Sequence, residues 1–310
     1  MARILIVCHW DNGQQGITLN NAFNKFTEHE SRCLTINESY LKYETDLLYH
    51  KYSNLELRQI LSDRDFFIFS ESIPWEIMSR IGLADRINKH NTIIRVGGTF
   101  CRRRTNDYLM LWLREGFMLT GSMHDWSLYG KIGRIAPTRN ILPIEKMPKP
   151  SPPNDIIKVA FSPTKQKKGV AEFNRVMTQL IKEYPESVEA VEIIGKPWEE
   201  CVKIKAHATH TFDQMLVSTY ANNCIESMYL GHTVLSKIDP WTRALYPDLP
   251  VIGVNSEQDL YHKLKQVIEE PERSREIGKL GREFVLRYHT PESVIKTWEA
   301  LIEHVKTAQL

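Results

Sequence analysis

Residues 220–236, "YANNCIESMYLGHTVLS", hold the pattern that decides the fold. Their apolar spacing predicts a short helix that ends at Gly231, followed by a strand from His232 to Ser236. Glu226 then lies in the early turns of that helix, near its positive end. A carboxylate there can be a mere partner of the helix dipole, worth about 0.3–1 kcal/mol, or a group that binds a ligand. The rest of the chain decides between these two roles.

The alternation of helix and strand continues through the whole chain. Residues 4–8 are uniformly apolar, as expected for a parallel strand covered on both faces, and a helix with Leu19, Phe23 and Phe26 on one face follows. The segments "DFFIFSES", "NTIIRVGG", "IIKVAFS" and "VEAVEIIG" read as further strands, and "WEIMSRIGLADRINKH" reads as a helical segment between two of them. This alternation predicts the α/β class with doubly wound parallel sheets.

A proline-rich stretch divides the chain. Residues 146–155, "KMPKPSPPND", carry four prolines and read as a stiff linker. We therefore expect an N-terminal Rossmann-like domain at 1–148 and a C-terminal one at 155–288. A last helix at 289–310 should pack back toward the N-terminal domain. The cleft between the two domains is the default ligand site.

Composition excludes several classes of protein. The 310 residues carry a formal net charge of +2, so no wholesale attraction to nucleic acid or membranes is implied. The five cysteines are scattered and form no CxxC pair, which argues against a disulfide framework and a structural zinc site. No apolar stretch approaches the roughly 18–20 residues of a membrane span. We expect a soluble, cytoplasmic protein without a stable membrane span.

Two glycine-containing loops follow predicted strands. "WDNGQQGIT" places Gly13 and Gly16 before a helix, where a backbone can approach a phosphate, although an ordinary strand–helix turn explains the same pattern. "FSPTKQKKGV" places Lys165, Lys167 and Lys168 before a helix, where lysine can neutralise a diphosphate. A solvated loop of lysines is the alternative.

A third loop leads into the helix that carries Glu226. "FDQMLVSTYANNCIE" passes from a short strand through small and polar residues into the helix, whose first backbone N–H groups could hold a phosphate. Glu226, a turn further on, is suited to accept two hydrogen bonds from a ribose diol. A capping glutamate remains the alternative.

Several of these motifs together resemble the family 4 glycosyltransferases. "IESMYLGHTVLS" follows the family's "EAMACGTPVV" pattern, and the segment from "VIGVNSEQDL" to "RYHTPESV" is similar to the helices that close family members. The resemblance covers residues 155–305, with a thinner likeness at "VGGTFCRRR". It implies a GT-B fold, which is two Rossmann-like domains facing across a cleft. It also implies a nucleotide-sugar donor such as a UDP- or GDP-sugar, transfer with retention, and no metal or other cofactor.

The resemblance assigns roles to the donor side. It places the ribose at Glu226, the diphosphate at Lys168, and the sugar and phosphates near Gly13 and Gly16. The residues that we predict to bind the donor in addition are Asp213, Ser218, Tyr220, Asn222 and Asn223.

Two positions depart from the family pattern. Ser218 stands where the family commonly has a second glutamate, and Pro163 stands where it often has an arginine, so Lys165 becomes the candidate second cation. Nucleotide binding is therefore better supported by the sequence than efficient transfer.

The acceptor should meet the N-terminal domain. Arg102 and Arg103 in "GGTFCRRRTNDY" could bind a phosphate or carboxylate, and His124 and Asp125 in "SMHDW" could approach the acceptor hydroxyl. The acceptor could be a glycan, a small molecule or DNA. Two alternatives therefore stay open, namely glycosylation of a modified base in DNA and a non-catalytic nucleotide-sugar-binding protein.

Overall fold

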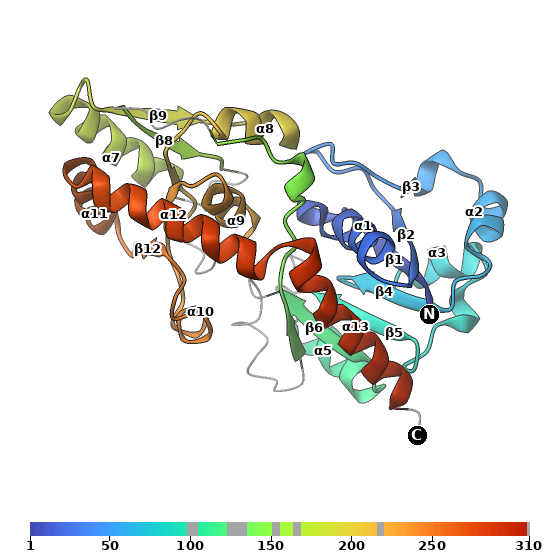
Figure 1. Ribbon diagram of the computed structural model, residues 1–310. Helices are drawn as coiled ribbons and strands as arrows, with labels where there is room; N and C mark the ends of the chain where they lie inside the picture. The colour runs from blue at the N-terminus through green and yellow to red at the C-terminus, as the bar shows by residue number, and fades with distance from the viewer. Residues whose placement is uncertain (98–104, 123–134, 151–155, 164–168, 216–219, 309–310) are drawn as a thin grey trace. The chain divides into compact units, whose positions relative to one another are not determined.

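The computed structural model describes residues 1–97, 105–122, 135–150, 156–163, 169–215 and 220–308, with backbone alone for residues 12, 105–108 and 122. The chain forms two compact units (Figure 1), Met1–Ile141 with Pro291–Leu310, and Leu142–Thr290. Leu142 is the first residue of the second unit, and its N–H donates to the carbonyl of His289 at 2.9 Å. The first unit therefore ends ahead of the proline-rich stretch.

Unit 1 is built on one parallel sheet. Its described strands are β1 (Arg3–Cys8), β2 (Glu30–Thr35), β3 (Leu47–Leu48), β4 (Phe66–Ser70), β5 (Thr92–Val96), β6 (Met118–Ser122) and β7 (Ile135–Thr138). They pair in the order β3-β2-β1-β4-β5-β6-β7. The order reverses between β1 and β4, which makes that point the switch point of the sheet.

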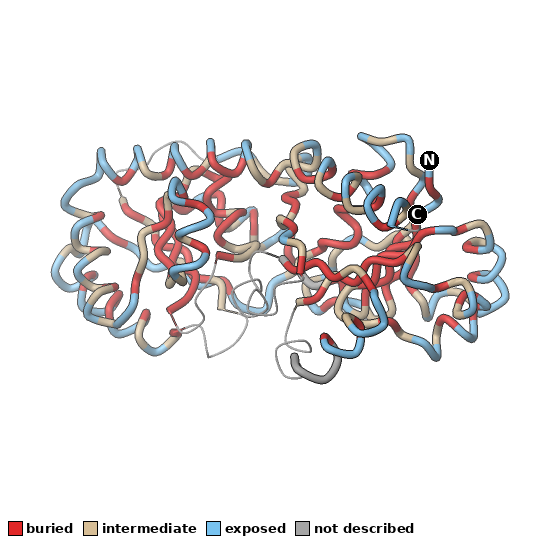
Figure 2. Tube along the Cα trace, turned by 90° about the horizontal axis from the view of Figure 1, so that it is seen from below, coloured by how far each residue is buried: buried red, intermediate tan, exposed pale blue. Residues whose placement is uncertain are grey.

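Helices cover both faces of this sheet. They are α1 (Gln15–Phe26), α2 (Asn54–Leu61), α3 (Trp75–Arg80), α5 (Thr105–Arg114) and α13 (Pro291–Thr307), with short 3-10 turns at Asn12–Gln14, Tyr49–Lys51 and Ala84–Arg86. Alternate residues of β1 serve the two layers: Ile4 and Ile6 pack with α1 and α13, and Leu5 and Val7 pack on the opposite face. The C-terminal helix α13 buries Trp298 in the core of unit 1. In Figure 2 the buried residues lie in the interior, and the surrounding helices expose their outer faces.

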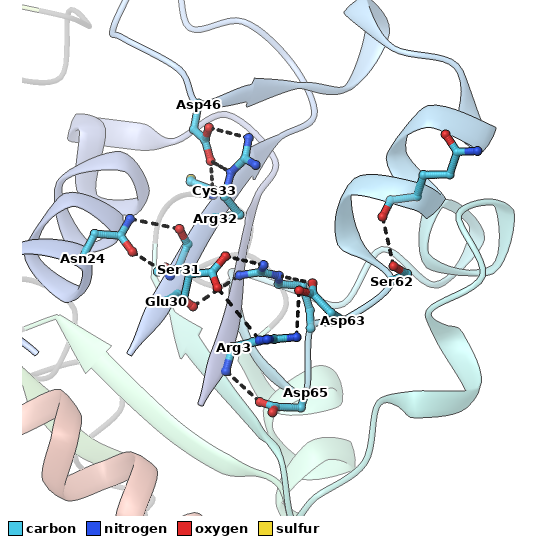
Figure 3. Close-up of polar contacts among 12 residues, drawn as sticks. Arg3, Asn24, Glu30, Ser31, Arg32, Cys33, Asp46, Ser62, Asp63 and Asp65 are labelled. Atoms are coloured by element: carbon cyan, nitrogen blue, oxygen red, sulfur yellow. Dashed lines mark hydrogen bonds and ion pairs between the residues drawn. The ribbon is translucent and has the colours of Figure 1, made fainter. Parts of the chain in front are cut away.

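Ion pairs fasten the amino ends of β1 and β2 (Figure 3). Arg64, whose side chain is buried, reaches Glu30 Oε1 at 2.6 Å and Asp63 Oδ1 at 2.8 Å. The backbone N–H of Arg3 donates to Asp65 Oδ1 at 2.9 Å. These contacts lie at the amino edge of the sheet, opposite the carboxyl edge at which open α/β sheets generally bind ligands.

Unit 2 repeats the plan with a smaller parallel sheet. Its strands are β8 (Ile157–Phe161), β9 (Val188–Glu192), β10 (His210–Phe212), β11 (Thr233–Ser236) and β12 (Val251–Gly253). They pair in the order β12-β11-β10-β8-β9, so the switch point lies between β8 and β10. The helices are α7 (Val170–Glu183), α8 (Trp198–Lys205), α9 (Asn222–Tyr229), α10 (Pro240–Leu245), α11 (Glu257–Glu269) and α12 (Pro271–Tyr288), with a 3-10 turn at Ile144–Lys146.

Close backbone contact joins α12 to the end of α9. The N–H of Gly231 donates to Met228 at 2.9 Å and the N–H of His232 donates to Ser227 at 3.0 Å, the two bonds that end a helix at a left-handed glycine. A side chain at Gly278 would collide with the carbonyl of Gly231, so α12 can pack this closely because residue 278 is glycine.

The structure confirms the predicted α/β class with two Rossmann-like units, and it shortens one predicted helix. The segment 75–90 was expected to be helical, but α3 ends at Arg80. Gly82 takes φ +72, its N–H donates to Ser79, and the N–H of Leu83 donates to Met78 at 2.8 Å. A left-handed glycine therefore ends this helix as Gly231 ends α9. Within the described residues, no helix is both long and apolar enough to cross a membrane.

Candidate functional site

Two loops meet at the switch point of unit 2. One follows β8 and ends at Gly169, and the other begins with Asp213, directly after β10. Gly169 takes φ +91, and a Cβ there would lie 3.5 Å from Cβ of Met215, so the two loops lie in contact. Glycine is needed at 169 because a left-handed backbone strains other residues.

Helices near this switch point begin without a side-chain cap. The residues that precede α7, α8 and α9 are Gly169, Pro197 and Ala221, none of which has a side-chain acceptor. By contrast, Asp239 and Ser256 cap α10 and α11 with their side chains. A helix N-terminus without a side-chain cap favours a bound anion, because its first N–H groups point outward at the positive end of the dipole.

Glu226 on α9 is held by two side chains from α8. Its Oε1 accepts from Nε1 of Trp198 at 2.8 Å, and its Oε2 accepts from Nζ of Lys205 at 2.7 Å. The Lys205 side chain is 2% exposed and that of Glu226 is 12% exposed. A carboxylate has about four lone-pair sites, so two bonds leave acceptor capacity on the exposed part of Glu226. The residue is therefore a positioned carboxylate and more than a partner of the helix dipole.

The contacts continue from Lys205 to the end of β10. Nζ of Lys205 also donates to Oδ1 of Asn223 at 2.7 Å, and Nδ2 of Asn223 donates to Oδ1 of Asp213 at 2.8 Å. Sγ of Cys224 donates to Oδ2 of Asp213 at 3.2 Å. Burial, followed by the negative charge of Asp213, raises the pKa of the Cys224 thiol well above its usual value, so the thiol keeps the proton that it donates. We call Trp198, Lys205, Asp213, Asn223, Cys224 and Glu226 the α8–α9 network.

The structure brings together three of the predicted donor residues and separates a fourth. Glu226, Asp213 and Asn223 belong to the α8–α9 network, and Asn222 is the first residue of α9. Tyr220 is 2% exposed, and its hydroxyl lies 3.3 Å from Nε2 of His289. Its ring packs edge-on against Tyr246 and Phe284, so the structure gives Tyr220 a packing role.

Other predicted residues lie outside the described part of the chain. These are the candidate donor and catalytic residues Lys165, Lys168, His124 and Ser218, and the candidate acceptor residues Arg102, Arg103 and Asp125. Among the residues that are described, no group of three or more histidine, cysteine, aspartate or glutamate side chains is placed to hold a metal ion.

The glycine loop of unit 1 is closed by a carboxylate of its own. The N–H groups of Gly16 and Ile17, at the start of α1, donate to the two oxygens of Asp11 at 2.6 and 2.9 Å. Burial raises the pKa of Asp11, and these two bonds oppose the rise. A Cβ at Gly16 would collide with Sγ of Cys8, and Gly13 takes φ +69. Packing and backbone conformation therefore account for both glycines.

Sequence reasoning missed Trp198 and Lys205. Trp198, Val202 and Lys205 recur at helical spacing on the buried face of α8. Lys205 could have been recognised from the sequence, because it is a lysine at a position where the helical period requires an apolar residue.

The sequence matches no protein-family model and no curated protein sequence. Solved structures resemble the fold over nearly the whole chain. They include Anabaena HepE in complex with UDP-glucose (TM-score 0.67, 9% identity, covering 98% of this chain and 100% of that one). An alpha-glucosyltransferase in complex with UDP and a 13-mer DNA containing a central A:G mismatch is also similar (TM-score 0.66, 12% identity, covering 98% of this chain and 100% of that one).

A third similar structure is a UDP-GlcNAc 2-epimerase from Neisseria meningitidis bound to UDP-GlcNAc (TM-score 0.59, 12% identity, covering 98% of this chain and 100% of that one). At identities this low, likeness speaks for the fold alone. The chain accordingly has the fold of GT-B glycosyltransferases and UDP-GlcNAc 2-epimerases, with two Rossmann-like α/β units.

Proposed function

We propose that the chain is a glycosyltransferase that moves a sugar from a UDP-sugar to an acceptor hydroxyl. The observation that carries this proposal is the Glu226 carboxylate, held by Trp198 and Lys205 beside the switch point of unit 2. That position is where open α/β sheets bind ligands. Similar structures bound to UDP and UDP-glucose support the choice of donor.

Each part of the donor has a partner in this proposal. Glu226 accepts hydrogen bonds from the ribose hydroxyls, which are strengthened by its charge. The N-termini of α7 and α9 receive the diphosphate, and Lys165 and Lys168 add positive charge to it. Fixed donors and cations of this kind stabilise the leaving diphosphate as its bond to the sugar breaks.

The resemblance to family 4 supports transfer with retention and without a metal ion, and both belong to the proposal. In the transfer, the acceptor oxygen bonds to the anomeric carbon, and the bond from that carbon to the diphosphate breaks. The electron pair of that bond and the proton of the hydroxyl both go to the diphosphate.

Calorimetric titration with UDP tests the role of Glu226. Glu226→Gln keeps the shape of the side chain but removes its charge, and hydrogen bonds to a charged group are worth about 1.5–3 kcal/mol. We expect UDP affinity to fall about ten- to hundredfold. The control is Glu257→Gln, which makes the same chemical change at a surface carboxylate held by Arg175 at 2.7 and 2.9 Å, and should leave affinity unchanged. A folded Glu226→Gln variant with wild-type affinity would contradict the assignment.

A second function, epimerisation at C2 of UDP-GlcNAc, is favoured by the likeness to the epimerase. The two reactions differ in whether an acceptor is needed. Incubation of UDP-GlcNAc with the protein alone, followed by proton NMR, detects inversion at C2. Release of UDP that depends on an added acceptor identifies transfer, and binding with neither reaction identifies a non-catalytic nucleotide-sugar-binding protein.

A further inference from the structure

Exposed aromatic side chains gather at the carboxyl edge of the unit 1 sheet. Tyr40, Trp10 and Trp75 are 69%, 50% and 46% exposed. Tyr40 and Trp10 lie in the loops after β2 and β1, and Trp75 begins α3 at the end of the loop after β4. These strands are neighbours in the sheet and run parallel, so all three loops leave the same edge. Nε2 of His9 and Oγ of Ser72 form a 2.9 Å hydrogen bond that joins the loop of Trp10 to that of Trp75. We call these three residues the aromatic rim.

The same three loops contain strained backbone. In the described part of the chain, the residues other than glycine with positive φ are Asp11, Gln14, Lys42 and Glu71, at +38°, +49°, +50° and +75°. All four lie in the loops that carry the aromatic rim. Such conformations cost of order 1–3 kcal/mol each and cluster at ligand-binding sites, where neighbouring contacts fix them.

Charge around the aromatic rim selects the ligand. Segments 9–14, 36–46 and 71–76 contain six carboxylates and one lysine, Lys42. Asp11 caps α1, Asp46 pairs with Arg32 at 2.8 Å, and Glu76 pairs with Arg80. Glu38, in the loop after β2, is exposed beside Tyr40. Polyphosphate ligands require cations, so an acidic rim disfavours a nucleic acid.

We propose that the aromatic rim binds a neutral carbohydrate, whose ring packs on Trp10 and Trp75. A sugar ring has an apolar face that suits the flat surface of an indole, and its hydroxyls donate to a carboxylate such as that of exposed Glu38. This inference rests on the proposed function only in naming the bound sugar as the glycosyl acceptor. It then makes the acceptor a glycan, as distinct from DNA.

Titration with disaccharides tests this proposal. Maltose, cellobiose, lactose and N,N′-diacetylchitobiose are titrated into the full-length protein with UDP present, and binding is followed by saturation-transfer NMR. We expect at least one disaccharide to bind with millimolar affinity. Trp10→Ala and Trp75→Ala should each weaken it at least fivefold. The matched control is Trp241→Ala, an exposed tryptophan (58%) on α10 of unit 2. It should change neither sugar nor UDP affinity.

The outcomes separate this proposal from the proposed function. Absence of binding by all four disaccharides, or rim variants that bind them as the Trp241→Ala protein does, would overturn the carbohydrate site. So would binding of a 13-mer DNA duplex that depends on Trp10 and Trp75. Disaccharide binding through these tryptophans in a protein that binds no UDP would overturn the proposed function and support the carbohydrate site.

Discussion

The carboxyl edges of the two sheets differ in what occupies the helix N-termini beside them. Each has a buried aspartate beside the helix that leaves a central strand. In unit 1, Asp11 accepts from the backbone N–H groups of Gly16 and Ile17 and so closes the N-terminus of α1. In unit 2, Asp213 is bonded by the side chains of Asn223 and Cys224, and α9 begins after Ala221, which supplies no cap.

This difference assigns different ligand chemistry to the two edges. A carboxylate on the backbone N–H groups occupies the place that a phosphate would take. Unit 1 therefore presents the aromatic rim, which suits an uncharged ring. Unit 2 leaves helix N-termini without side-chain caps beside the α8–α9 network, which suits a nucleoside diphosphate. Both edges come from one topological plan, and the polar residues after the strands make the distinction.

Removal of the Lys205 charge should have the largest effect. Lys205→Met keeps most of the volume but leaves Glu226 as a nearly buried carboxylate without its cation. Breaking a buried pair in this way costs about 3–5 kcal/mol, so we expect the free energy of unfolding of unit 2 to fall by about that amount. Urea unfolding followed by hydrogen exchange of β10 and β11 measures it.

The control is an exposed pair of the same length. Nζ of Lys196 lies 2.7 Å from Glu200, but their side chains are 45% and 48% exposed. Water already solvates these charges, so Lys196→Met should leave the urea midpoint unchanged. Equal effects of the two substitutions would show that burial of the α8–α9 network does not matter to its strength.

Mild acid should weaken unit 2 more than unit 1. Burial lowers the pKa of His210 and of His232 to about 3, from 6.5 in the unfolded chain. Between these values the unfolded chain binds more protons, so stability is lost as the pH falls below 6.5. Each histidine contributes at most about 1.4 kcal/mol per pH unit, and together we expect a loss of about 2–4 kcal/mol by pH 5. Burial also lowers the pKa of His9 and of His29 in unit 1, but those two side chains are only partly buried.

Hydrogen exchange at pH 7.5 and pH 5, corrected for the intrinsic rate, compares the strands of the two units. In unit 1 the pKa of buried Asp11 is raised, so its burial becomes less costly as the pH falls. Protection should therefore fall in β10 and β11 before it falls in β1 and β4. Loss in β1 first would contradict the neutral burial of these two histidines.

Much of the fold follows from local sequence. The uniformly apolar run in β1 and the helix end at Gly231 are both visible as patterns and both appear in the structure. The strand β2, "ESRCLT", was not predicted, because its polar residues are accounted for by distant partners. Arg32 pairs with Asp46, and the side chain of Asn24 accepts from the N–H of Ser31 at 2.7 Å. Contacts of this kind produce no periodic pattern of apolar residues by which the strand could be recognised in the sequence.

The candidate site could be predicted only at its centre. Glu226 could be predicted from the sequence because its helix, the glycine that ends the helix and the following strand form one continuous motif. Trp198 and Lys205 were not, since they reach Glu226 through the packing of α8 against α9. Tyr220 also lies beside this motif, but its ring packs against residues from α12 and beyond, which the local pattern does not indicate. Which polar residue meets the site depends on tertiary packing.

The smallest effect is expected at the cap of α1, and it tests the comparison most directly. Asp11→Ala removes the acceptor of two N–H groups, and loss of an N-terminal cap costs about 0.5–2 kcal/mol. Urea unfolding of unit 1 should show a loss in this range.

If Asp11 occupies an anion position, 50 mM phosphate should then raise the melting temperature of the Asp11→Ala variant more than that of the wild type, at constant ionic strength. Ser256→Ala, which removes a side-chain cap of α11, controls for general loss of stability. An equal response to phosphate in the wild type and Asp11→Ala would mean that the two edges differ for a reason other than this carboxylate.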